Sequence, residues 1–351
     1  MWYSILRNPL GEPPCTENYE GTRTFLWEHV VQQLTLGTRC VGICPVKSVE
    51  VIVEGAKFRG RSGLGEQAES GLAGALWALR PSRYLRRVPN RETLLVDITD
   101  LKQPVHVDGA DPASLADFAD KNPQKRLAVL KRHRGGASRD AWFEMLHRGP
   151  LRSPARREAE NLAGLALAGV SVPAPLAYWE SSPRGLTAPG SRFWGSLLLM
   201  EYLPHRETLH DLVWAGDSRA RPLLGELAGI VGDMHGAGWY HRDLYMEHVI
   251  LSERGLAILD AGRARQQARP LARWFEKDLA ALWTSRSPKL PKRANMQFLY
   301  RWGQTFGMHT LGRGLTVDEL RCWLPRIGRR GKKLLAHAPR HVHADPPAKD
   351  E

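Results

Sequence analysis

Residues 239–251 read Trp-Tyr-His-Arg-Asp-Leu-Tyr-Met-Glu-His-Val-Ile-Leu, and residues 256–262 read Leu-Ala-Ile-Leu-Asp-Ala-Gly. The first segment places a His-Arg-Asp triplet before a short apolar run, and the second is an apolar strand pattern that ends in Asp-x-Gly. The carboxylates of these two segments belong to Asp243 and Asp260, and His248 follows Asp243 by five positions. A loop and a strand end so close in sequence predict that the three side chains share one polar site.

These residue types, in this order, suit phosphoryl transfer from a nucleotide. Asp243 is predicted to accept the proton of an acceptor hydroxyl and to orient it, and Asp260 to bind Mg²⁺ between the β- and γ-phosphates of ATP. Arg242 is predicted to be an internal cation of the loop and His241 a packing and hydrogen-bonding support. His248 stands where protein kinases have Asn, and two roles stay open for it: second metal ligand or structural hydrogen-bonding residue.

An upstream lysine and glutamate complete this pattern. Residues 127–130 read Leu-Ala-Val-Leu and predict a strand ending at Lys131, as in the strand whose lysine holds the α- and β-phosphates. A lysine after a strand is usually an ordinary surface residue, so the assignment depends on an acidic partner. Ser153 and Gly169 flank a predicted helix on which Glu158 shares a face with apolar residues. Glu158 is predicted to pair with Lys131, and the alternative is a surface acid.

The junction between two predicted lobes lies after a near-continuous apolar strand at residues 195–202. The strand runs into Met-Glu-Tyr-Leu, after which the pattern becomes helical. In a two-lobed kinase this junction is the hinge, so the backbone at Glu201 and Leu203 is predicted to take the adenine edge.

The predicted fold class is α+β, a two-lobed protein-kinase-like fold. Its N-lobe would be a small antiparallel sheet with one helix, and its C-lobe would be larger and mainly helical. The expected divisions are an N-terminal extension of unknown role, the N-lobe, the C-lobe and a basic disordered tail, at residues 1–90, 91–203, 204–327 and 328–351.

Periodicity gives further elements, with a polar connection expected at residues 108–123. The other predicted strands and helices cover residues 48–54, 93–99, 170–180, 24–36, 66–79, 221–237 and 274–284. Residues 60–65 read Gly-Arg-Ser-Gly-Leu-Gly and form a weak candidate for a phosphate loop, because the Walker lysine and the full dinucleotide pattern are missing.

The composition narrows the partners. Hydrophobic content of 42% and charged content of 25% exclude a wholly disordered chain. A net charge of +13 predicts attraction to a polyanion, such as nucleic acid, an anionic membrane surface or a phosphorylated glycolipid. The basic residues come in short runs, each of which is typical of a solvated face, and no basic stripe is interleaved with aromatic residues, so no specific nucleic acid is expected.

Cysteine use and hydropathy indicate the compartment. The four cysteines are too scattered for a disulfide framework, and the pair Cys40 and Cys44 lacks a second ligand pair at zinc spacing. No segment has the length and apolarity of a membrane span or a signal peptide. The expectation is a cytoplasmic protein, soluble or peripherally attached.

Residues 241–248 read His-Arg-Asp-Leu-Tyr-Met-Glu-His, and the Tyr and second His at these positions resemble the lipopolysaccharide core kinases, which phosphorylate Kdo or heptose of the inner core. The similarity extends through residues 158–165, 168–175 and 273–282 in the family's order. It implies an ATP- and Mg²⁺-dependent sugar kinase at the cytoplasmic face of the inner membrane, acting on a phosphorylated glycolipid or sugar acceptor.

Some features depart from that resemblance. The first ninety residues match no recognisable pattern, and Ala261 follows the metal-binding Asp where protein kinases have Phe. Trp274 and Asp278 fit a structural role in a helix packed under the loop. Alternatives are a kinase for a protein or small-molecule acceptor, and a pseudokinase that acts as a binding module; retention of Lys131, Asp243 and Asp260 together argues against the last.

Overall fold

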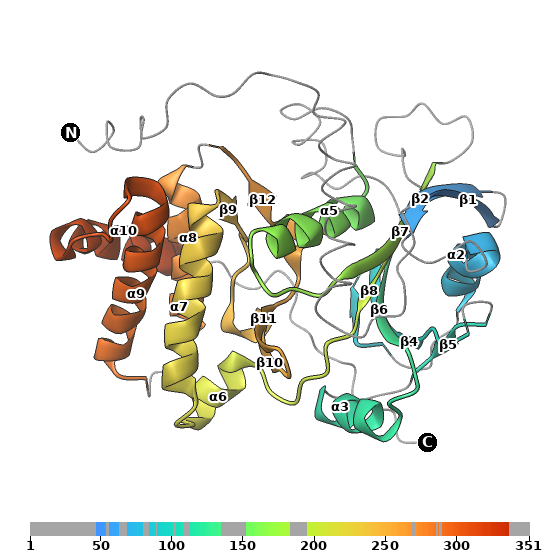
Figure 1. Ribbon diagram of the computed structural model, residues 1–351, viewed down its shortest axis with the longest axis horizontal. Helices are drawn as coiled ribbons and strands as arrows, with labels where there is room; N and C mark the ends of the chain where they lie inside the picture. The colour runs from blue at the N-terminus through green and yellow to red at the C-terminus, as the bar shows by residue number, and fades with distance from the viewer. Residues whose placement is uncertain are drawn as a thin grey trace.

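The computed structural model describes the chain in the ranges 47–53, 56–62, 69–79, 84–88, 90–100, 103–107, 112–134, 152–182, 195–268, 271–285, 287 and 290–336. A sheet lobe and a helical lobe lie at opposite ends of the molecule, with α5 and the short strands β9 to β12 between them (Figure 1). This is a two-lobed, kinase-like arrangement, as the sequence predicts.

The strands are β1 (Lys47–Val53), β2 (Ala56–Ser62), β3 (Arg86–Val88), β4 (Arg91–Asp97), β5 (Val105–His106), β6 (Leu127–Arg134), β7 (Pro175–Ser182), β8 (Gly195–Glu201), β9 (Trp239–Tyr240), β10 (Val249–Ser252), β11 (Gly255–Ile258) and β12 (Arg265–Gln266). The α-helices are α2 (Glu69–Ala78), α3 (Pro112–Lys121), α5 (Pro154–Leu167), α6 (Leu209–Ala215), α7 (Ala220–Gly236), α8 (Ala272–Thr284), α9 (Lys292–Leu311) and α10 (Val317–Ala336).

The large sheet runs in the order β1-β2-β7-β8-β6-β4-β3, with β5 paired to β4, and every pairing is antiparallel. Successive side chains of strand β8 point to opposite faces of the sheet, and both faces are buried. Leu197 and Leu199 pack with α2 on one face, whereas Leu198 and Met200 join the core that contains α5. This two-sided burial explains the unbroken apolar run in the sequence.

Helix α5 begins as predicted. The Ser153 hydroxyl accepts a hydrogen bond from Arg156 N, Pro154 occupies the first turn, and Gly169 adopts a φ of 79° just beyond the end. Its apolar face, with Leu162 and Leu165, is completely buried against the sheet. The helix therefore presents Glu158 from a rigid, well-packed element.

The sheet lobe differs from the prediction of a single helix. Helices α2 and α3 also belong to it, and α3 lies within residues 108–123, which the sequence assigned to a polar connection. The predicted extension at residues 1–90 also differs, because β1 and β2 add to the sheet beside β7, and β3 pairs with β4. Backbone pairing across many residues, rather than local pattern, decides this membership. The predicted helix at residues 24–36 and the cysteines Cys15, Cys40 and Cys44 lie outside the described residues.

The helical lobe is built on α7 and α9, whose packing surrounds an aromatic cluster. Trp302 is fully buried, stacks on Phe306 with ring centroids 4.9 Å apart, and meets Trp323 of α10 edge to face. Helix α10 continues to Ala336, so the prediction of a disordered tail from residue 328 is wrong for residues 328–336. None of the helices in the described ranges combines the length and apolarity needed to cross a membrane.

The close packing of α5 against β9 can be tested by substitution. A Cβ added to Gly164 would lie 2.2 Å from Trp239 Cζ2, so Gly164→Ala must displace a buried indole. We expect this substitution to lower the free energy of unfolding by roughly 1–3 kcal/mol, measured by chemical denaturation.

The matched control is Gly229→Ala in α7, where an added Cβ meets nothing within 4 Å. Because Ala favours helix over Gly, the control should be neutral or stabilising by up to about 1 kcal/mol. Equal destabilisation of both variants would contradict the proposed close packing at Trp239.

Candidate functional site

The His-Arg-Asp loop is held from below by one buried carboxylate. Asp278 of α8 is fully buried, and its Oδ2 and Oδ1 accept hydrogen bonds from the backbone amides of His241 and Arg242 at 2.6 and 2.7 Å. Arg242 has a φ of 75°, a conformation that costs energy for a side chain with a Cβ. The two short charge-assisted bonds offset this cost and fix the loop. Asp278 thus has the structural role beneath the loop that the sequence predicts.

The two residues before Asp243 support the loop rather than line the cavity. The His241 side chain is buried, its Nε2 lies 3.1 Å from the Leu259 carbonyl oxygen, and burial lowers its pKa. The Arg242 guanidinium lies over the Trp274 ring, 5.3 Å from its centroid. These contacts agree with the supporting positions predicted for His241 and Arg242.

Asp243 reaches the cavity with its carboxylate held by two cations. Arg263 Nη1 donates to both carboxylate oxygens at 2.9 and 3.1 Å, and Lys277 Nζ lies 3.5 Å from Oδ1. The Asp243 carbonyl oxygen accepts a hydrogen bond from His248 Nδ1 at 2.8 Å. With its proton on Nδ1, the neutral His248 ring keeps a lone pair on Nε2. The ring can therefore accept a further ligand at Nε2.

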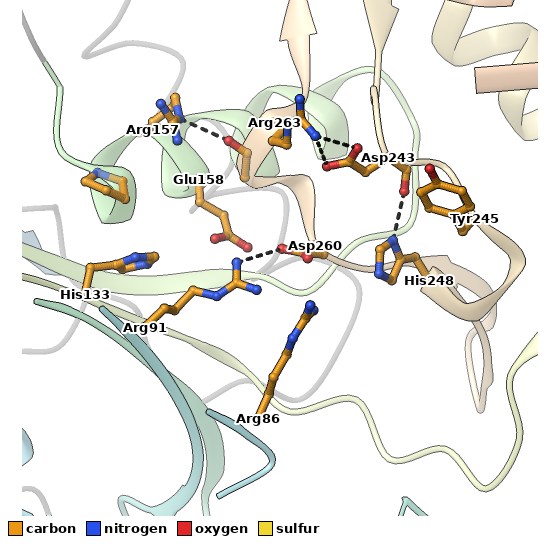
Figure 2. Close-up of a pocket in the computed structure, with 12 residues that line it drawn as sticks. Arg86, Arg91, His133, Arg157, Glu158, Asp243, Tyr245, His248, Asp260 and Arg263 are labelled. Atoms are coloured by element: carbon orange, nitrogen blue, oxygen red, sulfur yellow. Dashed lines mark hydrogen bonds and ion pairs between the residues drawn. The ribbon is translucent and has the colours of Figure 1, made fainter. Parts of the chain in front are cut away.

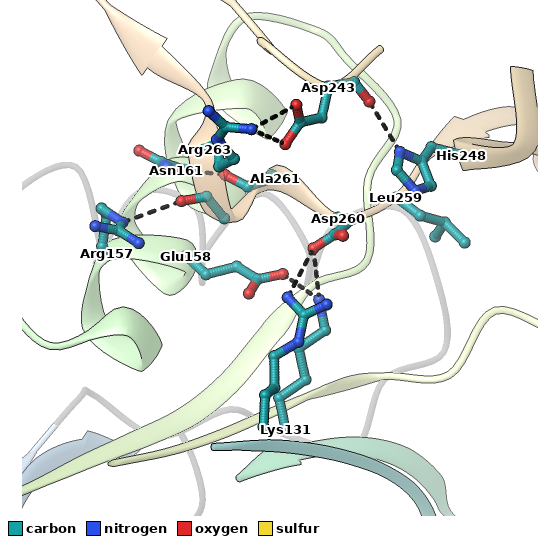
Figure 3. A network of polar contacts seen from close by, with 12 residues as sticks. Lys131, Arg157, Glu158, Asn161, Asp243, His248, Leu259, Asp260, Ala261 and Arg263 are labelled. Carbon is teal, nitrogen blue, oxygen red and sulfur yellow. Dashed lines mark hydrogen bonds and ion pairs between the residues drawn. The ribbon is translucent and has the colours of Figure 1, made fainter. Parts of the chain in front are cut away.

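A charge network joins the two lobes (Figure 3). Lys131 Nζ of β6 lies 2.5 Å from Glu158 Oε1 of α5 and 3.1 Å from Asp260 Oδ1. Burial disfavours the lysine's charged form, but the two carboxylates outweigh burial and raise the pKa of Lys131. Lys131 in turn, followed by Arg91, holds the pKa of Asp260 well below its usual range despite burial. The predicted pairing of Lys131 with Glu158 is present, and Asp260 stays ionised.

The Asp-Ala-Gly segment is positioned by α5. Asp260 has a φ of 59°, Asn161 Nδ2 donates to the Ala261 carbonyl oxygen at 2.9 Å, and Arg157 Nε donates to the Gly262 carbonyl oxygen at 3.0 Å. A Cβ on Gly262 would come within 3.2 Å of Glu158 Oε2. The glycine permits the close approach of this segment to α5.

These groups surround a cavity of about 370 Å³ between the lobes. Figure 2 shows Arg86 and Arg91 reaching toward Asp260 from the sheet, with Asp243 and Arg263 on the opposite side. The cavity is lined by Arg86, Arg91, His133, Pro154, Arg157, Glu158, Asp243, Tyr245, His248, Asp260, Gly262 and Arg263. Four of the predicted site residues are therefore brought to one cavity from α5, the loop and the end of β11.

The hinge residues lie apart from this cavity lining. The Glu201 carboxylate pairs with Arg254 Nη2 at 2.5 Å and accepts from Ala174 N at 3.2 Å, which ties the sheet lobe to the β10–β11 turn. The Leu203 carbonyl oxygen lies 2.9 Å from His205 Nδ1. Within the described part of the chain, Leu203 N–H has no hydrogen-bond acceptor. This amide therefore remains available to a ligand.

The glycine-rich candidate at residues 60–65 is placed elsewhere. Gly60 lies in β2, which is separated from Lys131's strand by β7 and β8, and residues 63–65 lie outside the described ranges. The strands next to β6 on the other side are β4 and β3. The sheet order therefore does not favour residues 60–65 as the phosphate loop.

Sequence reasoning missed the arginines of the cavity. Arg86 lies in a basic run that was interpreted as a solvated face, and Arg91 and Arg157 carry no motif of their own. A signal existed for His133, which follows Lys131 by two positions on a strand and so shares its face. Arg263 directly follows the Asp-Ala-Gly motif, but only the fold turns it toward Asp243.

The chain matches the model of the lipopolysaccharide kinase (Kdo/WaaP) family over residues 117–302, more than half of its length. The chain belongs to this family. The matched region includes Lys131, Glu158, Asp243 and Asp260, so the family resemblance expected from the sequence is confirmed.

Individual relatives carry the same family name. The chain is 33% identical over 162 residues to the lipopolysaccharide core heptose(I) kinase WaaP of Pseudomonas aeruginosa, covering 41% of this chain and 58% of that protein. It is 32% identical over 173 residues to the protein of that name from Escherichia coli, covering 44% and 62%. The alignments thus span about three fifths of these relatives. A solved structure of WaaP in complex with acyl carrier protein is similar over 74% of this chain and 91% of that one, with 25% identity and a TM-score of 0.48.

Buried histidines predict the pH dependence of stability. Burial lowers the pKa of His235 and His241, and burial together with Lys131 and Arg91 lowers that of His133 to about 3. Below the unfolded value of about 6.5, the unfolded chain binds more protons than the folded chain. Stability should therefore fall as pH falls from 7 to 5, by up to about 1.4 kcal/mol per pH unit for each histidine. Denaturant unfolding at the two pH values measures the loss.

A variant separates one histidine from the rest. His133→Asn removes the group whose pKa is lowered to about 3 and should make the loss of stability between pH 7 and 5 smaller. If the wild-type protein were equally stable at pH 7 and pH 5, the prediction that these three histidines are neutral in the folded state would be wrong.

Proposed function

We propose that the chain is an ATP-dependent kinase that phosphorylates a sugar hydroxyl, of Kdo or heptose, in the lipopolysaccharide inner core or a similar glycolipid. The observation that carries this proposal is the convergence of Asp243, His248, Asp260 and the Lys131–Glu158 pair on one cavity. Membership of the lipopolysaccharide kinase family supports it, as do relatives that are named heptose(I) kinases.

Asp243 acts as the base in this proposal. The acceptor hydroxyl lies against its carboxylate, and its oxygen attacks the γ-phosphorus while the bond from that phosphorus to ADP breaks. The hydroxyl proton passes to the Asp243 carboxylate. Arg263 and Lys277 fix the direction of the carboxylate, so the acceptor oxygen is oriented before the transfer.

The sheet lobe binds the nucleotide in this proposal. Lys131 holds the α- and β-phosphates, and Glu158 keeps the ammonium in place and charged. The free Leu203 amide donates to the adenine edge. The Glu201 amide already donates to the Ala174 carbonyl oxygen, so Glu201 offers only its carbonyl oxygen at the hinge, while its side chain ties the lobes together. In this proposal the nucleotide contacts the sheet lobe, whereas the acceptor contacts the His-Arg-Asp loop.

Asp260 and His248 fit a divalent cation. Asp260 presents an ionised carboxylate and His248 a free Nε2, and the described residues contain no cluster of three or more ligands. Two protein ligands are typical for Mg²⁺, which completes its shell with nucleotide phosphates and water. The ion would neutralise charge on the β- and γ-phosphates.

The net charge of +13 supports an anionic setting for the acceptor. A phosphorylated glycolipid in the cytoplasmic leaflet of the inner membrane presents negative charge at a surface, where basic residues contribute attraction. We therefore propose peripheral binding at the cytoplasmic face of that membrane, with no transmembrane helix required.

The base is tested with Asp243→Asn and Mg-ATP on deacylated lipopolysaccharide, read by mass spectrometry of the acceptor. We expect turnover to fall by roughly 10²- to 10⁴-fold, because the amide accepts no proton, while ATP affinity stays within about twofold. The matched control is Asp233→Asn, an exposed residue of α7 paired with His309. Transfer at the wild-type rate in Asp243→Asn would overturn the assignment, and transfer only to protein or small-molecule acceptors would overturn the substrate class.

The role of His248 is tested through metal dependence. His248→Ala should raise the Mg²⁺ concentration needed for thermal stabilisation by ATP by about tenfold, and His248→Asn should restore part of it, because an amide oxygen can bind the ion. His309→Ala, at an exposed position, is the control. If His248→Ala shows the same Mg²⁺ dependence as the wild type, His248 is not a metal ligand and its role is the hydrogen bond to the Asp243 carbonyl oxygen.

A further inference from the structure

The β3–β4 hairpin lines the cavity with Arg86 and Arg91, and in protein kinases a glycine-rich loop covers the nucleotide phosphates. The hairpin stands next to β6, the strand of Lys131, at the edge of the sheet. Its sequence at residues 86–91 is Arg-Arg-Val-Pro-Asn-Arg, which contains no glycine. Backbone amides brought close by glycine therefore cannot be the means by which this hairpin holds phosphate. The hairpin offers side chains instead.

The strand register places two basic side chains of the hairpin and two of β6 on the same face of the sheet. Arg91 lies opposite His133, Thr93 opposite Lys131, and Arg86 opposite Thr93. Directly opposed residues share a face of the sheet, as do residues two apart on a strand. Arg86, Arg91 and His133 line the cavity on the face of the sheet that also carries Lys131, and Figure 2 shows the two arginines pointing toward Asp260.

Polar atoms of this group lack partners. Arg91 Nη1 lies 3.9 Å from Asp260 Oδ1, too far for a hydrogen bond, and Arg91 Nε is buried without an acceptor. His133 Nε2 is also buried without a partner. Buried polar groups are almost always hydrogen-bonded, so Arg91 Nε and His133 Nε2 indicate a ligand. The Arg86 side chain is exposed and lines the same cavity, where it can reach that ligand.

The charges around the cavity specify the ligand as an anion. Asp243, Glu158 and Asp260 carry three negative charges, whereas Lys131 and the four arginines that line the cavity carry five positive ones. The cavity therefore has an excess of positive charge, and guanidinium presents a planar fork that matches phosphate oxygens. His133 is neutral because burial and its cationic neighbours lower its pKa to about 3, so it can add a hydrogen bond without adding charge.

We propose that Arg86 and Arg91 bind the β- and γ-phosphates of the nucleoside triphosphate, with His133 beside them, and so replace a glycine-rich loop with guanidinium groups. This inference rests on the proposed function. The nucleotide is favoured over the acceptor because Arg91 shares the sheet face of Lys131 and lies beside Asp260, whereas the acceptor's base Asp243 is on the far side of the cavity.

The test measures binding of ATP, ADP and AMP to the full chain by titration calorimetry with Mg²⁺. Arg91→Gln and Arg86→Gln should weaken ATP binding by about tenfold or more, ADP less, and AMP by no more than about twofold, because each removes charge-assisted bonds to the terminal phosphates. Arg91→Lys, which keeps the charge but not the fork, should lie between Arg91→Gln and the wild type.

Arg87→Gln is the matched control. Arg87 belongs to the same hairpin, but it alternates to the other face, where its exposed side chain lies over the Tyr84 ring at 4.9 Å. This variant should bind all three nucleotides as the wild type does, and thermal unfolding checks that each variant is folded.

The outcomes separate the two proposals. An equal loss for ATP and AMP, an equal loss in Arg87→Gln, or unchanged ATP affinity with a raised KM for the acceptor would overturn the role of the arginines while leaving the kinase intact. Wild-type protein that binds no nucleotide would overturn the proposed function itself.

Discussion

The ion network of Lys131, Glu158 and Asp260 is the interaction on which the site depends. Moving three charged groups out of water is costly unless each is paired, and loss of one partner leaves an uncompensated buried charge. The network joins β6, α5 and the segment after β11, which lie far apart in the chain. It therefore fixes both the ionised state of Asp260 and the placement of the sheet lobe against the helical lobe.

A second constraint acts from the opposite side. Asp278 holds the backbone of His241 and Arg242 with its two oxygens, and through them it determines where Asp243 emerges. The left-handed backbone at Arg242 and Asp260 is unfavourable for residues with side chains, at a cost of order 1 kcal/mol each. The surrounding hydrogen bonds stabilise both conformations. The carboxylates of the loop and of the strand end are thus positioned by separate networks that meet at one cavity.

The cavity concentrates positive charge beyond what its own carboxylates require. Four arginines line it together with three carboxylates, and Lys131 adds a further cation at its edge. A partly enclosed site strengthens such charges relative to water, so the arrangement suits an anionic group that carries several charges. The net charge of the whole chain predicted a polyanionic partner, but it could not predict which basic residues would line the cavity.

The sequence by itself determined the elements and motifs that depend on neighbours along the chain. The Ser153 cap, the apolar face of α5, the unbroken run of β8 and the spacing of Asp243, His248 and Asp260 are local features, and each was readable because helix and strand periodicity is set within a few residues. The resemblance to the lipopolysaccharide core kinases, carried by Tyr245 and His248 after the His-Arg-Asp triplet and by three further segments, is confirmed by the match to the family model.

Only the tertiary structure decided which distant residues meet. Strands β1 to β3 join the sheet, α3 forms within a polar stretch, and Arg86, Arg91 and His133 face the cavity because strand register, which is a long-range property, aligns them. The pattern of a single strand does not say which strand will lie beside it. The His-Arg-Asp and Asp-Ala-Gly motifs could therefore be recognised in the sequence, whereas the cationic lining around them depends on pairing between segments that are far apart in the chain.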